Sequence, residues 1–126
     1  MSATRGDQRL DLGRRGEALA ARRLEAEGYR IVARNYRCRA GEIDLVALDG
    51  EQIVFVEVRT RHGDSWGTPE ESVTRMKQAH LLAAAETYLA EHEAWDADWR
   101  IDVVAIDIAP GGLVRRLEIV RDAVHE

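Results

Sequence analysis

The chain has 126 residues, of which 45% are hydrophobic and 33% are charged, and its formal net charge is −5. This length suits one domain spanning residues 1–126, and the composition is that of a globular protein rather than a disordered one. The sequence has no apolar run suited to a membrane-spanning helix or a secretion signal, and Cys38 has no second cysteine to pair with. We therefore expect a cytoplasmic protein without a membrane partner.

The charges are distributed unevenly along the chain. Residues 1–40 contain ten Arg and five acidic residues, whereas residues 86–126 contain four Arg and ten acidic residues. The negative net charge argues against a protein that coats nucleic acid without specificity, but the basic N-terminal part can still form a local phosphate-binding face. Lys77 is the only lysine among the 18 Lys and Arg residues.

The first predicted element is a helix over residues 11–27. Asp11 is a suitable cap, good helix formers follow it, and a glycine just after the segment is placed to end the helix. At 3.6 residues per turn, Glu17 shares a side with apolar residues and should lean toward the interior. Gly13 and Gly16 remove side-chain bulk just before Glu17, which would let another element approach closely.

A strand is predicted over Tyr29–Tyr36, followed by a hairpin whose strands span residues 42–48 and 51–58 and are joined by Asp49-Gly50. Apolar side chains occupy both faces of these two strands, which is typical of strands covered on both sides in the centre of a sheet. The alternation places five apolar residues on one face of the hairpin: Ile43, Leu45, Val54, Val56 and Val58.

The second half of the chain begins with a polar loop over Thr60–Thr68. Thr68-Pro69-Glu70-Glu71 then predicts the start of a long helix that ends near His92. Two further strands are predicted over Arg100–Ile108 and near Leu113–Val120. The order αβββαββ indicates an α/β fold with a mixed central sheet flanked by helices.

Two acidic residues, Asp44 and Glu57, interrupt the apolar pattern of the hairpin. Because side chains alternate across a strand, their relative position depends on the loop. A two-residue loop at Asp49-Gly50 would place Asp44 opposite Phe55 and diagonal to Glu57, whereas a four-residue loop over 49–52 would place the two acids directly opposite each other. Either loop puts both carboxylates on the same face.

Two carboxylates on a largely apolar face repel each other and lose hydration, so the pair needs a compensating cation. Mg²⁺ and Mn²⁺ suit oxygen ligands, and Mg²⁺ often binds one or two carboxylates while keeping waters that can face a phosphate. We therefore predict a Mg²⁺ or Mn²⁺ site at Asp44 and Glu57, where the ion would polarise a phosphoryl oxygen and activate water. Arg59 would hold the phosphate, and Glu17 would approach as a water-mediated ligand.

The alternative interpretation of the same acids is a structural salt-bridge network. Arg59, Arg61 or Arg100 would then pair with the two carboxylates, and no metal would be required. Arg100 also shares a strand face with Asp102, and this pair is predicted to be structural.

Further basic residues near the hairpin are candidate nucleic-acid contacts. Arg37 and Arg39 precede its first strand, Arg61 follows its second, and Lys77 lies on the second predicted helix. Basic side chains at these positions would suit phosphate binding. The alternative is that they are ordinary solvated surface residues, which is the more common role of a lysine on such a helix.

The hairpin motifs belong to a longer set of motifs along the chain. They are Gly13-x-x-Gly16-Glu17-x-x-Ala20, Gly41-Glu42-Ile43-Asp44-Leu45, Phe55-Val56-Glu57-Val58-Arg59-Thr60-Arg61, Ser72-Val73-x-x-x-Lys77, Ala85-x-x-Tyr88-Leu89 and Arg100-Ile101-Asp102-Val103-Val104. Together they resemble the uncharacterised bacterial YraN family, which belongs to the restriction-endonuclease-like PD-(D/E)xK superfamily and is similar to archaeal Holliday-junction resolvases. The resemblance implies an αβββαβ nuclease core over about residues 11–108, followed by a C-terminal strand near 113–120. It also places Asp44 and Glu57 at the metal-binding acid positions and Glu17 at the helix acid.

The chain departs from the superfamily at position 59, where Arg59 replaces the usual catalytic lysine. Arginine binds phosphate bidentately but stays protonated, so a role that needs a neutral amine is closed to it.

One hypothesis is a metal-dependent endonuclease that cuts DNA, with branched or damaged DNA as candidate substrates. The other is a non-catalytic DNA-binding or assembly module that retains the nuclease fold. RNA is a less favoured substrate, and a resolvase-like role would favour a homodimer.

Overall fold

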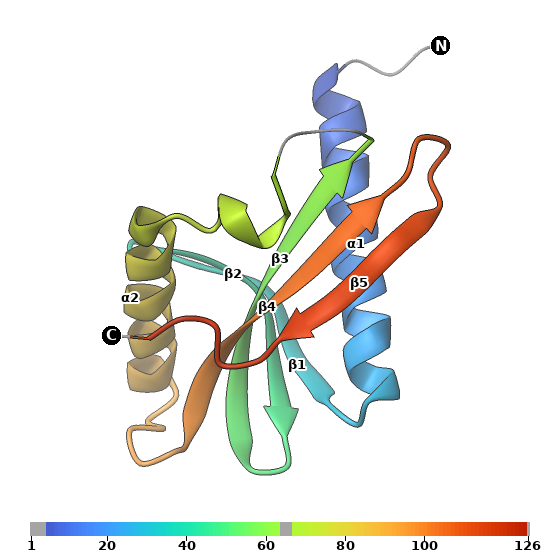
Figure 1. Cartoon of the computed structure of the whole chain (residues 1–126). Coiled ribbons are helices and arrows are strands. Elements are labelled where there is room, and N and C mark those ends of the chain that lie inside the picture. The colour runs from blue at the N-terminus through green and yellow to red at the C-terminus, as the bar shows by residue number, and fades with distance from the viewer. Residues whose placement is uncertain (1–4, 64–66, 126) are drawn as a thin grey trace.

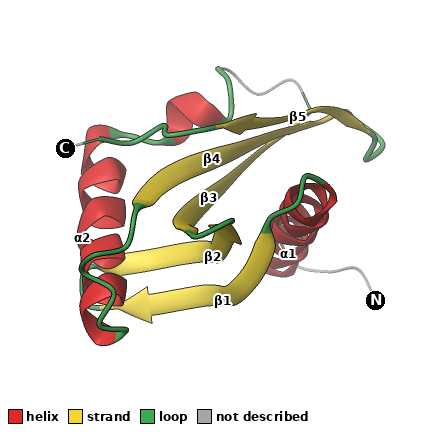
Figure 2. Cartoon of the chain, turned by 90° about the horizontal axis from the view of Figure 1, so that it is seen from below, coloured by secondary structure: helices red, strands yellow, loops and turns green. Residues whose placement is uncertain are grey.

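The computed structural model describes residues 5–63 and 67–125 and has a five-stranded mixed sheet flanked by two helices (Figure 1). The strand order β1-β2-β3-β4-β5 follows the chain, and only β3 and β4 run parallel to each other. The elements are α1 (Arg5–Ala26), β1 (Arg30–Cys38), β2 (Gly41–Asp49), β3 (Gln52–His62), α2 (Arg75–Glu91), β4 (Trp99–Ile108) and β5 (Val114–Val120). This confirms the predicted α/β class, and Figure 2 shows the sheet between α1 and α2.

Two apolar clusters bury the sheet, one on each face. The cluster beneath α2 includes these buried residues: Ile43, Val46, Phe55, Leu81, Ala84, Tyr88, Ile101 and Val103. The cluster beneath α1 includes these: Ala20, Ala21, Leu24, Leu45, Ala47, Val54, Val56, Val104, Ile106 and Ile108. Strands covered on both faces carry apolar side chains in both directions, as the hairpin sequence predicts. Within the described residues, no helix is both long enough and apolar enough to cross a membrane.

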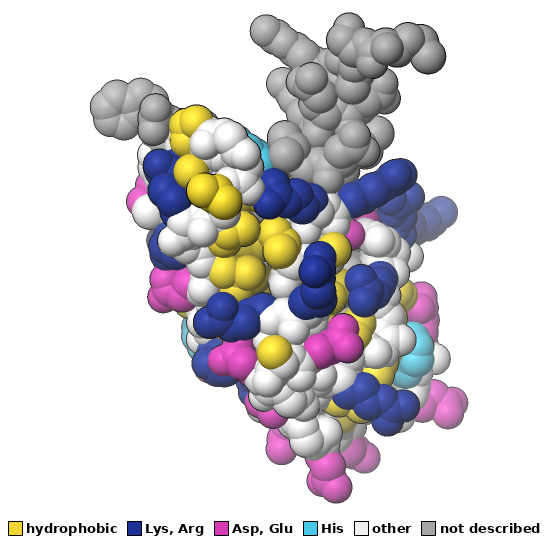
Figure 3. Space-filling view, turned by 90° about the vertical axis from the view of Figure 1, so that its right-hand side faces the viewer, with side chains coloured by type: hydrophobic (Ala, Val, Ile, Leu, Met, Phe, Trp, Pro, Cys, Tyr) yellow, Lys and Arg dark blue, Asp and Glu magenta, His cyan; other side chains and the backbone are white. Residues whose placement is uncertain are grey.

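The side of the molecule that carries α1 and β5 is covered less completely. Figure 3 shows hydrophobic side chains gathered in the upper part of this side among Lys and Arg side chains, and acidic side chains at its lower end. Leu117 and Ile119 of β5 are only partly buried against the cluster beneath α1, and Leu113 just before β5 is 77% exposed. The first helix therefore protects the central strands better than the edge strand.

The first helix begins earlier than predicted. It is already helical at Arg5, so the expected cap at Asp11 is wrong. The intervening residues contain no proline, and Gly6 alone does not stop the helix from extending toward the N-terminus. The predicted end is confirmed, because Gly28 takes a positive φ of 95° and the N–H of Tyr29 donates to the carbonyl of Leu24 at 2.9 Å.

The second helix begins later than predicted. The Thr68-Pro69 signal starts only a 3₁₀ turn over Glu70–Ser72. The chain then leaves helical geometry at Val73 (φ −85°, ψ 84°), whose side chain is buried in the cluster beneath α2. Thr74 caps the true helix by accepting the N–H of Lys77 on its hydroxyl oxygen at 3.2 Å.

The third strand is longer than predicted. Thr60 to His62 continue the strand, although the sequence predicts a loop from Thr60 onward. The parallel ladder with β4 explains the extension, because it runs without a break from Ile53↔Trp99 to His62↔Ile108. Polar side chains at the end of β3 therefore stand on a strand, and β4 fixes their direction.

The hairpin register is the one predicted for the four-residue loop, but the loop itself consists of Gly50 and Glu51, so the predicted loops at 49–50 and 49–52 are both wrong. Asp49 pairs with Gln52 and Leu45 pairs with Val56, a register that puts Asp44 across from Glu57. Leu45↔Val56 is the last pair of this ladder, whereas β1 and β2 stay paired as far as Cys38↔Gly41. Figure 1 shows these two strands curving together toward α2, so β2 leaves β3 at Asp44.

The bend in β2 changes the direction of one apolar side chain. Ile43 was expected on the face of Leu45, but it packs beneath α2 together with Val46 and Phe55. Leu45 packs beneath α1. The prediction for Ile43 is wrong because strict alternation assumes a regular strand, and β2 is not regular where it leaves β3.

Gly16 lets α1 approach β3 closely, as the sequence predicts. A Cβ atom at Gly16 would lie 2.5 Å from Cγ2 of Thr60, far inside normal contact distance. Gly13 does not share this role, because a Cβ there would meet nothing within 4 Å. The close contact at Gly16 sets the distance between α1 and β3, and with it the position of Glu17.

We predict that Gly16→Ala lowers the free energy of unfolding by about 1–2 kcal/mol, because the overpacking cost exceeds the gain in helix propensity. Adding Thr60→Ser, which removes the opposing methyl group, should restore most of this loss. Gly13→Ala is the matched control and should stabilise the helix by about 0.5–1 kcal/mol. Urea denaturation of the wild type and these three variants measures the changes, and equal effects at Gly13 and Gly16 would contradict the packing argument.

Candidate functional site

The separation of β2 from β3 leaves room for two carboxylates between the strands. Asp44 occupies the position after the last hairpin pair, and its Oδ2 accepts the backbone N–H of Val58 at 2.7 Å. The Asp44 side chain therefore takes the place of a strand carbonyl at the point where the ladder ends. Glu57 is adjacent on β3, with a side chain that is 13% exposed.

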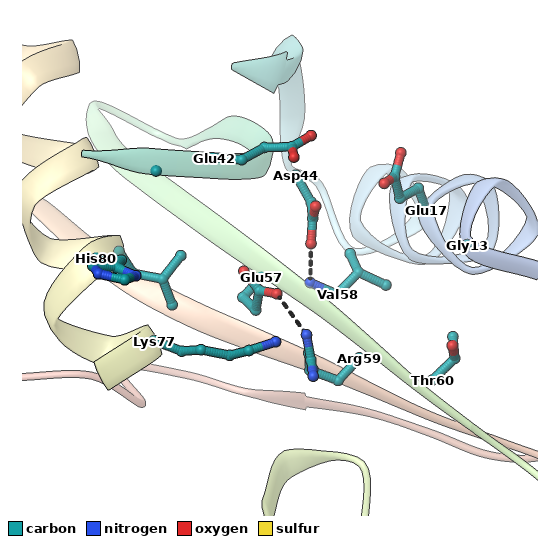
Figure 4. Close-up of a pocket in the computed structure, with 12 residues that line it drawn as sticks. Gly13, Glu17, Glu42, Asp44, Glu57, Val58, Arg59, Thr60, Lys77 and His80 are labelled. Carbon is teal, nitrogen blue, oxygen red and sulfur yellow. Dashed lines mark hydrogen bonds and ion pairs between the residues drawn. The ribbon is translucent and has the colours of Figure 1, made fainter. Parts of the chain in front are cut away.

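A cleft of about 340 Å³ opens over these two carboxylates (Figure 4). Residues from β2, β3 and both helices line it, so the sheet and the two covering layers meet at this one place. The lining residues are Gly13, Glu17, Gly41, Glu42, Asp44, Glu57, Val58, Arg59, Thr60, Lys77, His80 and Leu81. The structure thus brings together four residues predicted to act in catalysis, Glu17, Asp44, Glu57 and Arg59, and the predicted phosphate contact Lys77.

Asp44 has the most strongly altered proton affinity of these acids. Burial, and next the negative charge of Glu57, raise the pKa of its carboxyl from 3.8 to about 7. Glu17 and Glu42 act in the same direction, and the N–H of Val58 opposes them. The charged groups that act most strongly on Asp44 are therefore all carboxylates, and the ionised group is left without a matching positive charge.

Glu57 lies in a different electrostatic environment. Burial raises the pKa of Glu57, whereas the positive charges of Arg59 and Lys77 lower it. Arg59 Nη1 lies 3.4 Å from Glu57 Oε1, and its Nε donates to Ser72 Oγ at 2.7 Å. Arg59 is thus held between the strand and the 3₁₀ turn, and Lys77 reaches the same wall of the cleft from α2 (Figure 4).

Glu17 faces Asp44 and Glu42 from α1 (Figure 4). Burial raises the pKa of Glu17, and the negative charge of Glu42 adds to this effect. A side-chain hydrogen bond from Asn35 opposes the rise, as do the positive charges of Arg34 and Arg14. The helix acid is therefore close enough to the hairpin acids to interact with them electrostatically.

The remaining predicted contacts lie outside this cleft. Arg37 is 77% exposed and lies 3.5 Å from Glu42, while Arg39 is an exposed residue in the turn before β2. Arg61 follows Arg59 on β3 but pairs with Asp107 at 3.3 Å. It also donates to the carbonyl of Gly67 at 2.6 Å, so its guanidinium helps to join β3 to β4 and the chain beyond.

The competing salt-bridge interpretation fits some of the acids. Arg59 does pair with Glu57, but Arg61 and Arg100 pair with other residues. Arg100 Nε lies 3.0 Å from Oδ1 of the fully buried Asp102, which confirms the predicted structural pair. The Asp44 carboxylate accepts the N–H of Val58, which satisfies one oxygen but supplies no positive charge.

The sequence analysis missed two cleft residues, Glu42 and His80, and also Asn35, which hydrogen-bonds the cleft residue Glu17. Glu42 had a readable signal, because it lies two positions before Asp44 on the same strand. His80 lies one turn after Lys77 on α2 and could have been found by helical spacing. Asn35 carried no such signal, since it reaches Glu17 from a strand residue with a positive φ of 52°.

The carboxylate pair offers two protein ligands rather than a complete protein cage. Within the described residues, no group of three or more His, Cys, Asp or Glu side chains is arranged to hold a metal ion. Mg²⁺ does not need such a group, because it commonly binds one or two carboxylates and keeps several waters. The donor set of Asp44 and Glu57, open on one side to a cleft, fits that mode of binding.

Comparison with known proteins finds a family whose sequences match the part of the chain that forms this site. A family model described as uncharacterised protein family UPF0102 matches residues 16–106. A UPF0102 protein of Beutenbergia cavernae is 52% identical over 104 residues, 82% of this chain and 88% of the relative. UPF0102 proteins of Symbiobacterium thermophilum and Dehalococcoides mccartyi are 47% and 44% identical over 114 and 118 residues, covering 90% and 94% of this chain and 96% of each relative. The matched range contains every residue that lines the cleft except Gly13.

We predict that Asp44→Asn stabilises the fold at neutral and alkaline pH. The folded pKa of about 7 exceeds the ordinary value of 3.8, so the folded protein binds the Asp44 proton more tightly than the unfolded chain does. The resulting destabilisation is absent below about pH 4, grows as the pH rises, and is complete above about pH 7. Asparagine keeps the acceptor for Val58 without the charge, and the gain at about pH 8 should be of the order of 1–3 kcal/mol.

Thermal unfolding of wild type and Asp44→Asn at about pH 5 and about pH 8 measures this effect, and the difference should be larger at the higher pH. Asp96→Asn is a matched control, because Asp96 is exposed after α2. It should change stability by less than about 0.5 kcal/mol at either pH. An Asp44→Asn protein that is less stable than wild type at both pH values would contradict the electrostatic account.

Proposed function

The chain belongs to the uncharacterised protein family UPF0102, the YraN family that its motifs resemble, and we propose that it is a metal-dependent nuclease that hydrolyses DNA phosphodiester bonds. One observation carries the proposal: Asp44 and Glu57 are adjacent, largely buried, and open to a cleft that Arg59 and Lys77 also line, next to Glu57. Metal-assisted hydrolysis of a phosphodiester needs carboxylates that hold the metal ion and, beside them, basic side chains that hold the phosphate. The resemblance to the PD-(D/E)xK superfamily supports the same reaction, in the cytoplasm, with branched or damaged DNA as candidate substrates.

Asp44 and Glu57 would hold a Mg²⁺ or Mn²⁺ ion through their carboxylate oxygens. The raised pKa of both groups supports this assignment, because a nearby cation would relieve the repulsion and the lost hydration that raise them. When bound, such an ion supplies an activated water and polarises a phosphoryl oxygen. The products of the hydrolysis would be a phosphate monoester and a free hydroxyl group.

The protein's own residues would orient the substrate in this cleft. Arg59 is fixed by Ser72 and Glu57, so its remaining N–H groups are oriented in advance to bind a phosphate oxygen and the charge that develops on it. Lys77 adds a second positive charge from α2. Glu17 stands on the other side of Asp44 and would accept hydrogen bonds from water at the metal.

A second candidate function is DNA binding or assembly without cleavage. The ion pair between Arg59 and Glu57 favours this candidate, because it occupies one of the two carboxylates with a protein cation. Arginine also stays protonated, so it cannot replace a lysine that acts as a neutral amine. The two candidates differ in whether the unmodified chain turns over substrate.

The nuclease proposal predicts cleavage that depends on an added divalent ion. Purified protein should cut at least one of linear duplex, single-stranded and four-way-junction DNA with Mg²⁺ or Mn²⁺, and chelation by EDTA should stop the reaction. Asp44→Asn and Glu57→Gln should each slow cleavage by about 100-fold or more, since a metal ligand supplies several kcal/mol of transition-state stabilisation. Asp96→Asn is the control for preparation quality. Cleavage by Asp44→Asn at the wild-type rate would refute the assignment.

Substitution of Arg59 separates the two candidate functions. For a nuclease, Arg59→Lys keeps the charge but loses the bidentate geometry, so cleavage should fall by roughly tenfold, and Arg59→Gln should cost more. For a binding module, wild type should bind DNA without cutting it, and Arg59→Lys should introduce cleavage. Gel assays of cleavage and fluorescence anisotropy of labelled DNA give the two readouts. Robust wild-type cleavage that Arg59→Lys leaves unchanged excludes the binding module.

A further inference from the structure

A second cleft, of about 600 Å³, adjoins the first on the far side of Asp44. It lies among α1, β1 and β2, and it shares Gly13, Glu17, Glu42 and Asp44 with the first cleft. Four shared residues mean that the two hollows form one groove running across the hairpin acids. A chain molecule whose reacting bond lay at Asp44 and Glu57 would therefore extend into both clefts.

The new residues of the second cleft are Arg14, Asn35 and Arg37. Arg14 is exposed on α1 and lies near enough to Glu17 to lower its pKa. The side chain of Arg37 is 77% exposed, and its Nε lies 3.5 Å from a carboxylate oxygen of Glu42. Exposed ion pairs of this kind contribute little free energy, so a phosphate oxygen could replace the glutamate at small cost. Two guanidinium groups and an amide suit the recognition of a phosphate.

The backbone of Asn35 is a second observation at the same place. Asn35 lies between the pairs Arg34↔Leu45 and Tyr36↔Ile43, which puts it across from Asp44 on β1. Its φ of 52° is rare for a strand residue and costs energy that the surrounding structure must supply. The conformation directs the Asn35 amide to Glu17, which it hydrogen-bonds. Strained residues of this kind concentrate at sites that bind or react.

The charges of the second cleft depend on the state of the first. Arg14 and Arg37 face three carboxylates, those of Glu17, Glu42 and Asp44. A divalent ion at Asp44 and Glu57 would balance the charges of these two carboxylates, so Arg14 and Arg37 would face only Glu17 and Glu42, and the groove would repel a polyanion less. Phosphate binding in the second cleft is then strongest when the metal site is filled or when Asp44 is uncharged.

We propose that the second cleft is a phosphate-binding subsite, in which Arg14 and Arg37 hold the DNA phosphate next to the scissile bond. The inference rests on the proposed nuclease function and defines its substrate further, as a polynucleotide strand that crosses the hairpin acids. It adds Arg14 to the contacts predicted from the sequence and gives Arg37 a specific place. Asn35 is a positioning residue that acts through Glu17.

Binding measured without turnover tests the subsite. Asp44→Asn serves as the parent, because it neutralises the carboxylate shared by both clefts and prevents cleavage. Anisotropy of a short fluorescein-labelled single-stranded DNA should show that adding Arg14→Gln or Arg37→Gln weakens binding about fivefold. A plot of log affinity against log salt concentration has a negative slope. Each substitution should make this slope less steep by about 0.7, the value for one lost phosphate contact on a single strand. Arg23→Gln is the matched control, since Arg23 is an exposed residue on the opposite side of α1.

The outcomes separate the subsite from the nuclease function. Weaker binding in both cleft variants, with Arg23→Gln within about twofold of the parent, supports the subsite. Equal losses in all three variants, unchanged binding in the cleft variants, or no DNA binding by the parent would overturn it. Cleavage by the wild-type chain is scored separately with Mn²⁺. Cleavage together with unchanged binding in the cleft variants refutes the subsite alone, whereas a specific loss of binding without any cleavage refutes the nuclease alone.

Discussion

The burial of Asp44 beside Glu57 is the constraint on which the rest of the site depends. In a continuous antiparallel ladder the Asp44 side chain would stand above the sheet and could not take the place of a strand carbonyl, and a one-residue shift would send one of the two acids to the opposite face. The structure meets the constraint by ending the hairpin ladder at Leu45↔Val56 and giving the Val58 N–H to Asp44 instead of a strand carbonyl. The same bend carries Ile43 beneath α2. The site and the local irregularity of the core thus have a single cause.

The two helices reach this place from opposite faces of the sheet, and each depends on one local feature. Gly16 allows α1 to lie against Thr60, which brings Glu17 beside the hairpin acids. The break at Val73 buries that side chain and makes Thr74 the cap, and this fixes where along α2 Lys77 stands. An uninterrupted helix from Thr68 would have turned Lys77 in another direction, because each added residue rotates a helix by about 100°. The local geometry therefore decides which charges meet.

Several parts of this arrangement could be predicted from the sequence because they follow from periodicity. Alternation along the hairpin places the side chains of Asp44 and Glu57 on the same face. The close approach of another element to Gly16 follows from the missing side chain of glycine. Periodicity fails where tertiary packing takes over. The start of α2 depends on the burial of Val73, and the contact of Asn35 with Glu17 depends on a positive φ that only the bent β1 and β2 impose. Propensity rules treat Thr68-Pro69 as the stronger start, since they do not include the core that Val73 enters.

A comparison of two aspartates in this sheet distinguishes structural burial from functional burial. Asp102 is fully buried and fully compensated: Arg100 lies 3.0 Å away, the N–H of Asp122 donates at 2.9 Å, and the hydroxyl of Tyr29 donates at 3.4 Å. Asp44 receives one backbone N–H and faces other carboxylates across an open cleft. A fold that can surround one aspartate with donors could have done so for the other. Leaving Asp44 uncompensated lowers stability, and such a cost persists where the negative charge has a use, because a bound cation restores the balance. The uncompensated charge, more than the family pattern, is what makes the hairpin a candidate for metal binding.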